Sequence, residues 1–183
     1  MTVAFDNTFL SILLNPSGNI PIDPTSGAPI ANFKERAVAA VEKLDRAGQK
    51  VILPAPAVAE LLTAIGPGAT KYLTIIKDLG VLEVGSFDQR CAIELATLNN
   101  NEFSSGDKKS GAEPYQKRKV DRQIIAICKV NNVSELYTDD AGLAKSARLC
   151  GIKPVRTAEL EIPQSALQTE MSLDNPSADN AGT

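Results

Sequence analysis

The stretch Thr2-Val-Ala-Phe-Asp6-Asn-Thr8 decides the fold of this chain. The apolar run before Asp6 shows no alternation with polar residues, which is typical of a strand buried on both faces of a parallel sheet. A helical pattern follows at once, over residues 8–14. An acid at the end of a buried strand is costly unless it is paired, hydrogen-bonded or bound to a cation. Asp6 is therefore either the N-cap of that helix or a functional acid, and this stretch leaves both open.

The same order of strand and helix recurs along the chain. Further strands are predicted over residues 51–53, 81–84, 136–138 and 153–155, with a turn over 158–160. Further helices are predicted over residues 31–47, 56–65, 69–79, 88–98, 120–130 and 141–149, and polar loops over 15–30 and 99–119. Five short apolar strands alternating with helices predict a three-layer α/β/α sandwich with a mostly parallel five-stranded sheet.

The chain of 183 residues is predicted to form one domain over residues 1–160, followed by a disordered acidic tail over residues 161–183. No apolar run approaches the roughly 18 residues of a membrane span, and no signal peptide is recognised at the N-terminus. The three cysteines are far apart and are predicted to be free thiols. We therefore expect a cytoplasmic protein, where thiols stay reduced.

The chain contains no histidine. Its absence excludes Ser-His-Asp triads, histidine acid/base catalysis and histidine-ligated zinc. Carboxylate chemistry with a hard metal ion remains, because carboxylate oxygens are the ligands that such ions prefer.

Four acids are placed for such a site. In parallel sheets the site lies beyond the carboxyl ends of the strands, where Asp6 and Asp140 are predicted to lie. Glu60 falls early in a predicted helix, and Asp121 opens another. Each position also has a structural explanation: Glu60 as a solvated residue, Asp121 as a charge favoured by the helix dipole, and Asp140 as an N-cap.

Together these positions resemble a known family, the PIN-domain nucleases, and most of all the toxin-type (VapC-like) ribonucleases of type II toxin-antitoxin systems. The resemblance rests on four ordered motifs: Val3-Ala-Phe-Asp6-Asn-Thr8, Pro54-Ala-Pro-Ala-Val-Ala-Glu60-Leu-Leu, Lys119-Val-Asp121-Arg-Gln-Ile-Ile-Ala126 and Tyr137-Thr-Asp-Asp140-Ala-Gly-Leu143. It covers about residues 1–157. Family members often have Thr or Ser directly after the first acid, whereas this chain has Asn7, and the two polar loops look longer than in the compact toxins.

The resemblance implies a PIN-like fold and one metal site, whose catalytic and metal-binding acids are Asp6, Glu60, Asp121 and Asp140. It places Thr8 and Thr138 in supporting positions. Asp139 is the unmatched neighbour, expected either to support the site or to stand in for Asp140 as a ligand.

The chemistry expected from this set is hydrolysis of RNA phosphodiester bonds with Mg²⁺ or Mn²⁺ as cofactor. Basic residues near Asp121 are candidates for holding the RNA backbone, namely Lys117, Lys119 and Arg122; a solvated basic segment is the alternative. The resemblance also implies a protein antitoxin as partner and a homodimer. Two alternatives stay open: a PIN-fold nuclease of RNA maturation or of DNA without an antitoxin, and a non-catalytic interaction module.

Overall fold

The apolar run at the N-terminus forms the central strand of a five-stranded sheet. In the computed structural model, which describes residues 1–15, 18–23, 25–101 and 115–166, the strand order is β3-β2-β1-β4-β5. The strands are β1 (Thr2–Phe5), β2 (Lys50–Pro54), β3 (Leu82–Gly85), β4 (Val133–Tyr137) and β5 (Lys153–Val155). Every pairing between them is parallel, which confirms the predicted sheet.

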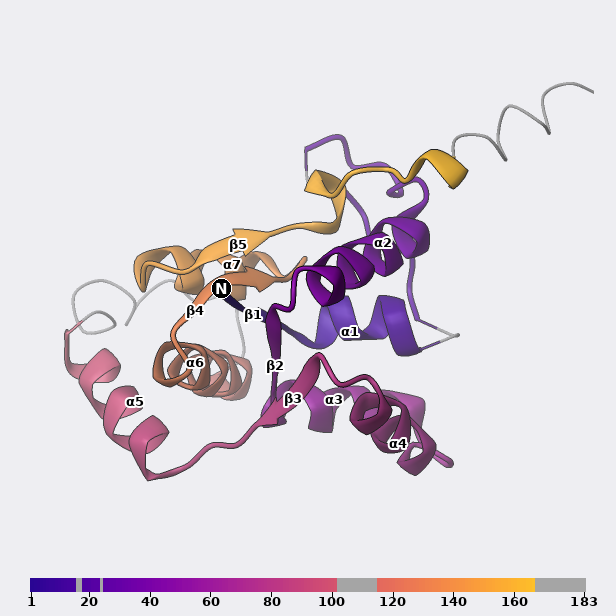
Figure 1. Cartoon of the computed structure of the whole chain (residues 1–183). Coiled ribbons are helices and arrows are strands. Elements are labelled where there is room, and N and C mark those ends of the chain that lie inside the picture. The colour runs from indigo at the N-terminus through magenta and orange to yellow at the C-terminus, as the bar shows by residue number, and fades with distance from the viewer. Residues whose placement is uncertain (16–17, 24, 102–114, 167–183) are drawn as a thin grey trace, which may run out of the picture.

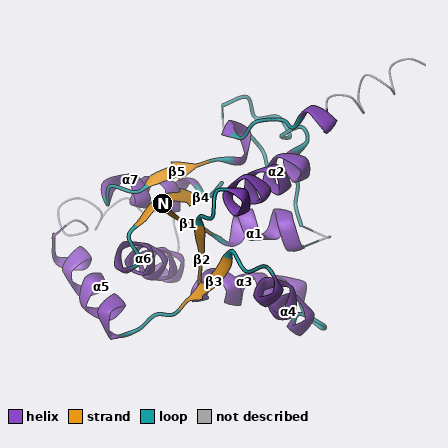
Figure 2. Cartoon of the chain, in the orientation of Figure 1, coloured by secondary structure: helices purple, strands orange, loops and turns teal. Residues whose placement is uncertain are grey.

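Helices cover both faces of this sheet (Figure 1). They are α1 (Asn7–Leu14), α2 (Phe33–Arg46), α3 (Ala55–Ile65), α4 (Thr70–Asp78), α5 (Gln89–Asn101), α6 (Tyr115–Val130), α7 (Ala141–Leu149) and the 3₁₀ turn η1 (Thr157–Glu159). Figure 2 shows α1 to α4 on one side of the strands and α5 and α6 on the other. The chain passes from the edge strand β3 through α5 and α6 to β4, which lies on the other side of β1. Two halves of the sheet therefore extend from β1 in opposite directions, and β1 and β4 meet where the strand order reverses.

The core explains why β1 takes the centre. Val3, Ala4 and Phe5 are fully buried. The Phe5 ring lies 4.7 Å from the ring of Phe9 in α1 and 5.2 Å from the ring of Tyr137 in β4, measured between centroids. These three rings join the central strand to the helix that follows it and to the neighbouring strand, just below the strand ends.

Gly85 at the end of β3 is required by close packing. A β-carbon there would lie 2.7 Å from Cγ2 of Ile52 and 2.9 Å from Cγ2 of Ile127, closer than real contacts of this kind. The absent side chain lets α6 pack directly onto β2 and β3, and this packing sets the height of α6 over the sheet.

The predicted loop over residues 99–119 is wrong at both ends. Helix α5 continues to Asn101 and α6 already begins at Tyr115, while residues 102–114 lie outside the described part of the chain. The run Gln116-Lys-Arg-Lys119 consists of good helix formers, and its charge does not oppose helix formation. Asp121 therefore lies in the second turn of α6 and not at its N-terminus, so the helix dipole does not explain it, because that effect fades within the first turn.

The remaining predicted elements match the structure to within three residues at their ends, and the elements over residues 2–5, 141–149 and 153–155 match it at both ends. Between α1 and α2 the described residues form no helix or strand, and an isolated antiparallel bridge joins Ile22 to Pro29. Cys91, Cys128 and Cys150 are free, as predicted. Of the predicted acidic tail, residues 167–183 lie outside the described residues. None of the helices in the described part of the chain is long and apolar enough to cross a membrane.

Candidate active site

Asp6 is the N-cap of α1 and is also buried against the end of β4. Its Oδ1 accepts hydrogen bonds from Phe9 N at 3.0 Å and from Thr8 Oγ1 at 2.7 Å, and its Oδ2 accepts one from Thr138 Oγ1 at 2.5 Å. The side chain is 2% exposed. Burial raises the pKa of Asp6 to about 6; these hydrogen bonds oppose the rise and the negative charge of Asp140 adds to it. The carboxyl group is thus positioned from three sides.

Asp140 occupies the equivalent position after the neighbouring strand β4. It is the N-cap of α7, where its Oδ1 accepts a hydrogen bond from Leu143 N at 2.9 Å. Its Oδ2 lies 2.7 Å from Nζ of Lys117 in the first turn of α6. Burial acts to raise the pKa of Asp140, but the hydrogen bond and charge of Lys117, together with the bond from Leu143 N, hold that pKa below its usual value.

Glu60 approaches from α3 and is exposed at the surface of that helix. Partial desolvation and the charge of Asp140 raise the pKa of Glu60, while Lys117 lowers it. Glu60 is thus a solvent-exposed glutamate that lies within electrostatic range of both Asp140 and Lys117.

Asp121 is buried in α6, with an exposed fraction of 8%. It follows Lys117 by four residues, so the two side chains lie on one face of the helix, one turn apart. Lys117 reaches Asp140, which shows that this face of α6 points toward the carboxyl end of β4. Asp121 therefore lies on the side of α6 that faces the other acids.

Asp139 turns away from this group and binds Thr157 instead. Its Oδ1 accepts a hydrogen bond from Thr157 N at 2.9 Å and its Oδ2 one from Thr157 Oγ1 at 2.6 Å. Its own N–H donates to Thr8 Oγ1 at 2.9 Å, the same hydroxyl that donates to Asp6. In this arrangement Asp139 supports the site through Thr8, and the geometry favours Asp140 as the ligand.

Backbone hydrogen bonds align these residues. Asp6 N donates to Tyr137 O at 3.2 Å, and Thr138 N donates to Val155 O at 2.9 Å, so the parallel pairing continues one residue past each strand. The Thr138 hydroxyl, which donates to Asp6, also accepts from Asp140 N at 3.1 Å. One threonine thus positions two of the acids, as expected for a supporting residue.

Lys119 and Arg122, predicted with Lys117 to hold RNA, lie elsewhere on α6. Lys119 is exposed. Arg122 Nη1 donates to Asn99 Oδ1 of α5 at 3.0 Å, so its guanidinium faces the neighbouring helix. Of the three predicted basic residues, Lys117 has the direct contact with the acid site.

Thr157 was missed by the sequence reasoning. It is fully buried and lies two residues beyond the end of β5. The signal that would have found it is the one that pointed to Asp6 and Asp140, namely a polar residue just past the carboxyl end of a parallel strand.

The donor set fits a divalent ion in its chemistry, because its ligands are carboxylate oxygens. Asp6 offers about four lone-pair sites, of which the three hydrogen bonds above use three, so one remains for a cation. The acids are not as close together as the ligands of a bound metal ion. Within the described residues, no three acidic or thiol side chains lie close enough together to hold an ion. Lys117 stands among the acids in this arrangement.

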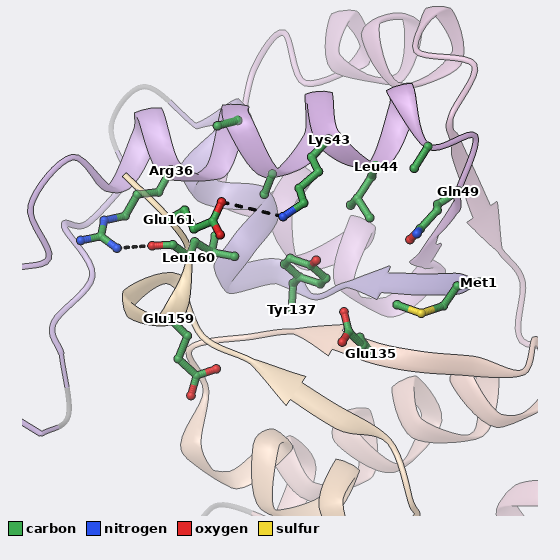
Figure 3. A pocket seen from close by; sticks show the side chains of 13 residues that line it. Met1, Arg36, Lys43, Leu44, Gln49, Glu135, Tyr137, Glu159, Leu160 and Glu161 are labelled. Atoms are coloured by element: carbon green, nitrogen blue, oxygen red, sulfur yellow. Dashed lines mark hydrogen bonds and ion pairs between the residues drawn. The ribbon is translucent and has the colours of Figure 1, made fainter. Parts of the chain in front are cut away.

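A separate cavity of about 350 Å³ lies under α2, away from these acids (Figure 3). Tyr137, Leu44 and Met1 line it. At its rim Arg36 Nη1 donates to the carbonyl oxygen of Leu160, which fastens the segment after η1 to α2. None of the predicted site residues lines this cavity, so it is distinct from the acid site.

Comparison with known proteins supports the fold of the chain. No protein-family model and no curated protein matches the chain. Among solved structures, a chain in the crystal structure of VapBC2 from Rickettsia felis bound to a DNA fragment from their promoter matches it with a TM-score of 0.54 and 12% identity. The alignment covers 85% of this chain and 98% of that one. At this identity the likeness shows the fold alone: this chain has an α/β fold of the PIN-like type, with a five-stranded parallel sheet flanked by helices.

Proposed function

We propose that this protein is a metal-dependent ribonuclease that hydrolyses RNA phosphodiester bonds and serves as the toxin of a toxin-antitoxin pair. The observation that carries the proposal is that Asp6 and Glu60, from two separate elements, both lie within electrostatic range of Asp140, whose carboxylate pairs with the Lys117 ammonium. Carboxylates at such close quarters need positive charge to stay ionised together. Asp121, buried on the facing side of α6, completes the proposed set.

In this proposal Asp6, Glu60, Asp121 and Asp140 hold Mg²⁺ or Mn²⁺. Such an ion lowers the pKa of its bound water and offsets charge on the phosphate under attack. The chain itself contributes position: Thr8 and Thr138 fix the carboxylate of Asp6, and Asp139 orients Thr8. The site needs no protein nucleophile and no histidine. Lys117, Lys119 and Arg122 are the proposed contacts to the RNA backbone.

The toxin part of the proposal is supported by the fold shared with a chain of the VapBC2 structure. We propose an antitoxin protein as partner and a homodimer as the assembled form. A toxin of this kind needs its acid site covered when it is not in use, and an antitoxin with a basic segment matches the charge of that site.

The test is cleavage of labelled single-stranded RNA by the purified protein in Mn²⁺, Mg²⁺ or EDTA. We expect cleavage that requires the metal and is lost in an Asp6→Asn, Asp121→Asn double variant. A folded wild-type protein that neither cleaves RNA nor binds Mn²⁺ would contradict the proposal and favour a non-catalytic interaction module.

A further inference from the structure

A cavity of about 390 Å³ with a mixed polar and apolar lining adjoins the acid site on the side of α1. Its volume falls within the range of small-ligand pockets, about 300–1,000 Å³. Its wall carries three amides and two hydroxyls, beside the apolar side chains of Ile12 and Ile20; the polar groups come from Asn7, Asn15, Asn19, Thr8 and Ser11. Ile20 is 55% exposed, so the cavity has an uncovered apolar side chain beside its polar groups.

The lining offers hydrogen bonds from amides and hydroxyls, beside one carboxylate. Asp139 is the charged residue of the lining, and Thr157 already binds both of its carboxylate oxygens. Amides and hydroxyls both donate and accept hydrogen bonds, while the isoleucines offer apolar contact. This chemistry suits a neutral planar group with donors and acceptors on its edge, and it suits neither a phosphate nor a metal ion.

The cavity and the acid site share a side chain. Thr8 lines the cavity, and its Oγ1 lies 2.7 Å from Oδ1 of Asp6. An RNA phosphodiester at the acids would place the base of an adjoining nucleotide beside α1. Single-stranded RNA is read in this way, by unstacked bases that are packed on side chains and hydrogen-bonded along their edges.

We propose that this cavity receives an unstacked base of the RNA, next to the bond that is cut, and so sets the sequence preference of cleavage. The inference rests on the proposed ribonuclease activity and names what selects its substrate. It gives a purpose to residues 18–21, which belong to the connection between α1 and α2 and line the cavity.

The test uses a pool of single-stranded RNA with randomised sequence, cleaved in Mn²⁺ and sequenced at the new ends. We expect the wild type to prefer one base at a fixed position beside the cut. A Ser11→Ala, Asn19→Ala double variant should lose roughly tenfold of that preference, the scale of one base contact. Asn19→Ala alone, at an exposed position, guards against a folding defect, and Gln89→Ala on α5 is the matched control that keeps the preference.

Three results would overturn the inference. A wild type without base preference, or a folded double variant with an unchanged preference, removes the base subsite and leaves the ribonuclease standing. A wild type that cleaves no RNA in any metal removes both.

A second inference rests on a different observation, the ion pair between Lys117 and Asp140. Their charged atoms lie 2.7 Å apart, with the Asp140 side chain 18% exposed and the Lys117 side chain 42% exposed. The charge of Lys117 also acts on Glu60. Among the described residues no three acids lie close enough together to hold an ion.

We infer that Lys117 is the counter-ion of the metal-free site, and that a divalent ion and the Lys117 ammonium compete for Asp140 and Glu60. Since binding of one weakens binding of the other by the same factor, removing the lysine should strengthen metal binding. The inference rests on the proposed metal site, and it assigns Lys117 a role before RNA arrives.

The experiment measures Mn²⁺ binding directly, from the loss of the electron paramagnetic resonance signal of free Mn²⁺. Lys117→Gln should bind Mn²⁺ roughly fivefold to tenfold more tightly than the wild type, as expected for losing one partly buried competing pair. Lys119→Gln, which removes the same charge from an exposed position on the same helix, should bind Mn²⁺ with at most a small gain. Thermal unfolding in EDTA and in Mn²⁺ adds a second readout, with a larger metal-induced rise in Tm for Lys117→Gln.

The outcomes distinguish the role of Lys117 from the existence of the metal site. Mn²⁺ affinity that is equal or weaker in Lys117→Gln, with a wild type that binds Mn²⁺, overturns the role of Lys117 alone. Binding by neither protein overturns this role and the metal site with it. Binding by Lys117→Gln but not by the wild type would support the inference most strongly.

Discussion

Asp6 and Asp140 occupy equivalent positions on neighbouring strands and have opposite electrostatic surroundings. Each follows a buried parallel strand, caps the next helix, and accepts a hydrogen bond from the N–H three residues on. Burial without a cation raises the pKa of Asp6 to about 6. At Asp140 burial works in the same direction, but Lys117 outweighs it and the pKa is lowered.

The difference shows that helix capping explains the positions of Asp6 and Asp140 but not the opposite shifts of their pKa values. Asp88, the N-terminal neighbour of α5, is a third acid just past a strand, and it accepts from Cys91 N at 3.0 Å. It follows β3 and pairs with the exposed Arg90. A hydrogen bond to the helix N-terminus and the contact with Arg90 lower the pKa of Asp88 to about 2. Asp88 behaves as a cap alone, which makes it the reference for the other two.

The largest expected effect is on catalysis. Asp6→Asn and Asp140→Asn should each lower kcat/KM for RNA cleavage by roughly 100-fold or more, because each removes a charged ligand from the proposed metal site. Asp88→Asn should cleave like the wild type, since it keeps a capping oxygen and removes a charge that is no part of the site. Cleavage rates under single-turnover conditions in Mn²⁺ decide the matter; equal losses in all three variants would mean that a negative charge at a helix N-terminus, and not a metal ligand, is what these acids provide.

The next effect separates Asp6 from Asp140 in stability. The folded pKa of Asp6 is about 6 against an ordinary value of 3.8, so the folded state binds the proton more tightly than the unfolded chain. Stability in EDTA should therefore fall as pH rises from about 4 to about 6, by on the order of 3 kcal/mol from this group. Asp6→Asn should remove that fall, and chemical denaturation across pH 4 to 8 measures it.

Asp140 should show the opposite sign. Its folded pKa lies below 3.8, so its contribution to stability is present above that pH and is lost as pH falls through the folded pKa. Asp140→Asn should then be less stable than the wild type at neutral pH in EDTA, and the difference should shrink in acid. If both variants shift stability in the same direction with pH, the contrast between the two caps is wrong.

The smallest expected effect is on the free energy of unfolding and comes from Thr157, which contacts neither Asp6 nor Asp140 directly. Thr157→Val removes the hydroxyl that donates to Asp139 Oδ2 at 2.6 Å and should lower the free energy of unfolding by about 1–2 kcal/mol. Thr157→Ser keeps the hydroxyl and should recover most of that loss. Denaturation of both variants beside the wild type measures the difference, and a loss in Thr157→Ser with none in Thr157→Val would show that the methyl group of Thr157, not its hydroxyl, matters.

The sequence predicted the sheet because its strands are short, apolar and regularly spaced, and because parallel strands bring their carboxyl ends to one edge. That reasoning placed Asp6 and Asp140 correctly. It misplaced Asp121, since a run of lysines and arginines looks like a loop but forms helix as readily as other long side chains. The contact of Lys117 with Asp140 could not be foreseen, because it depends on where α6 starts and which way its first turn faces.

The three free thiols differ in a way that serves spectroscopy. Cys91 and Cys128 are 1% and 0% exposed, and burial raises the pKa of each, so both should resist alkylation in the folded protein. Cys150, at the end of α7, is partly exposed. A nitroxide label on the native protein would thus attach at one position, at the opposite end of the helix that Asp140 caps. The nine residues of α7 then separate the label at Cys150 from Asp140. The distance from the label to a paramagnetic Mn²⁺ at the acid site can be measured without any amino-acid substitution.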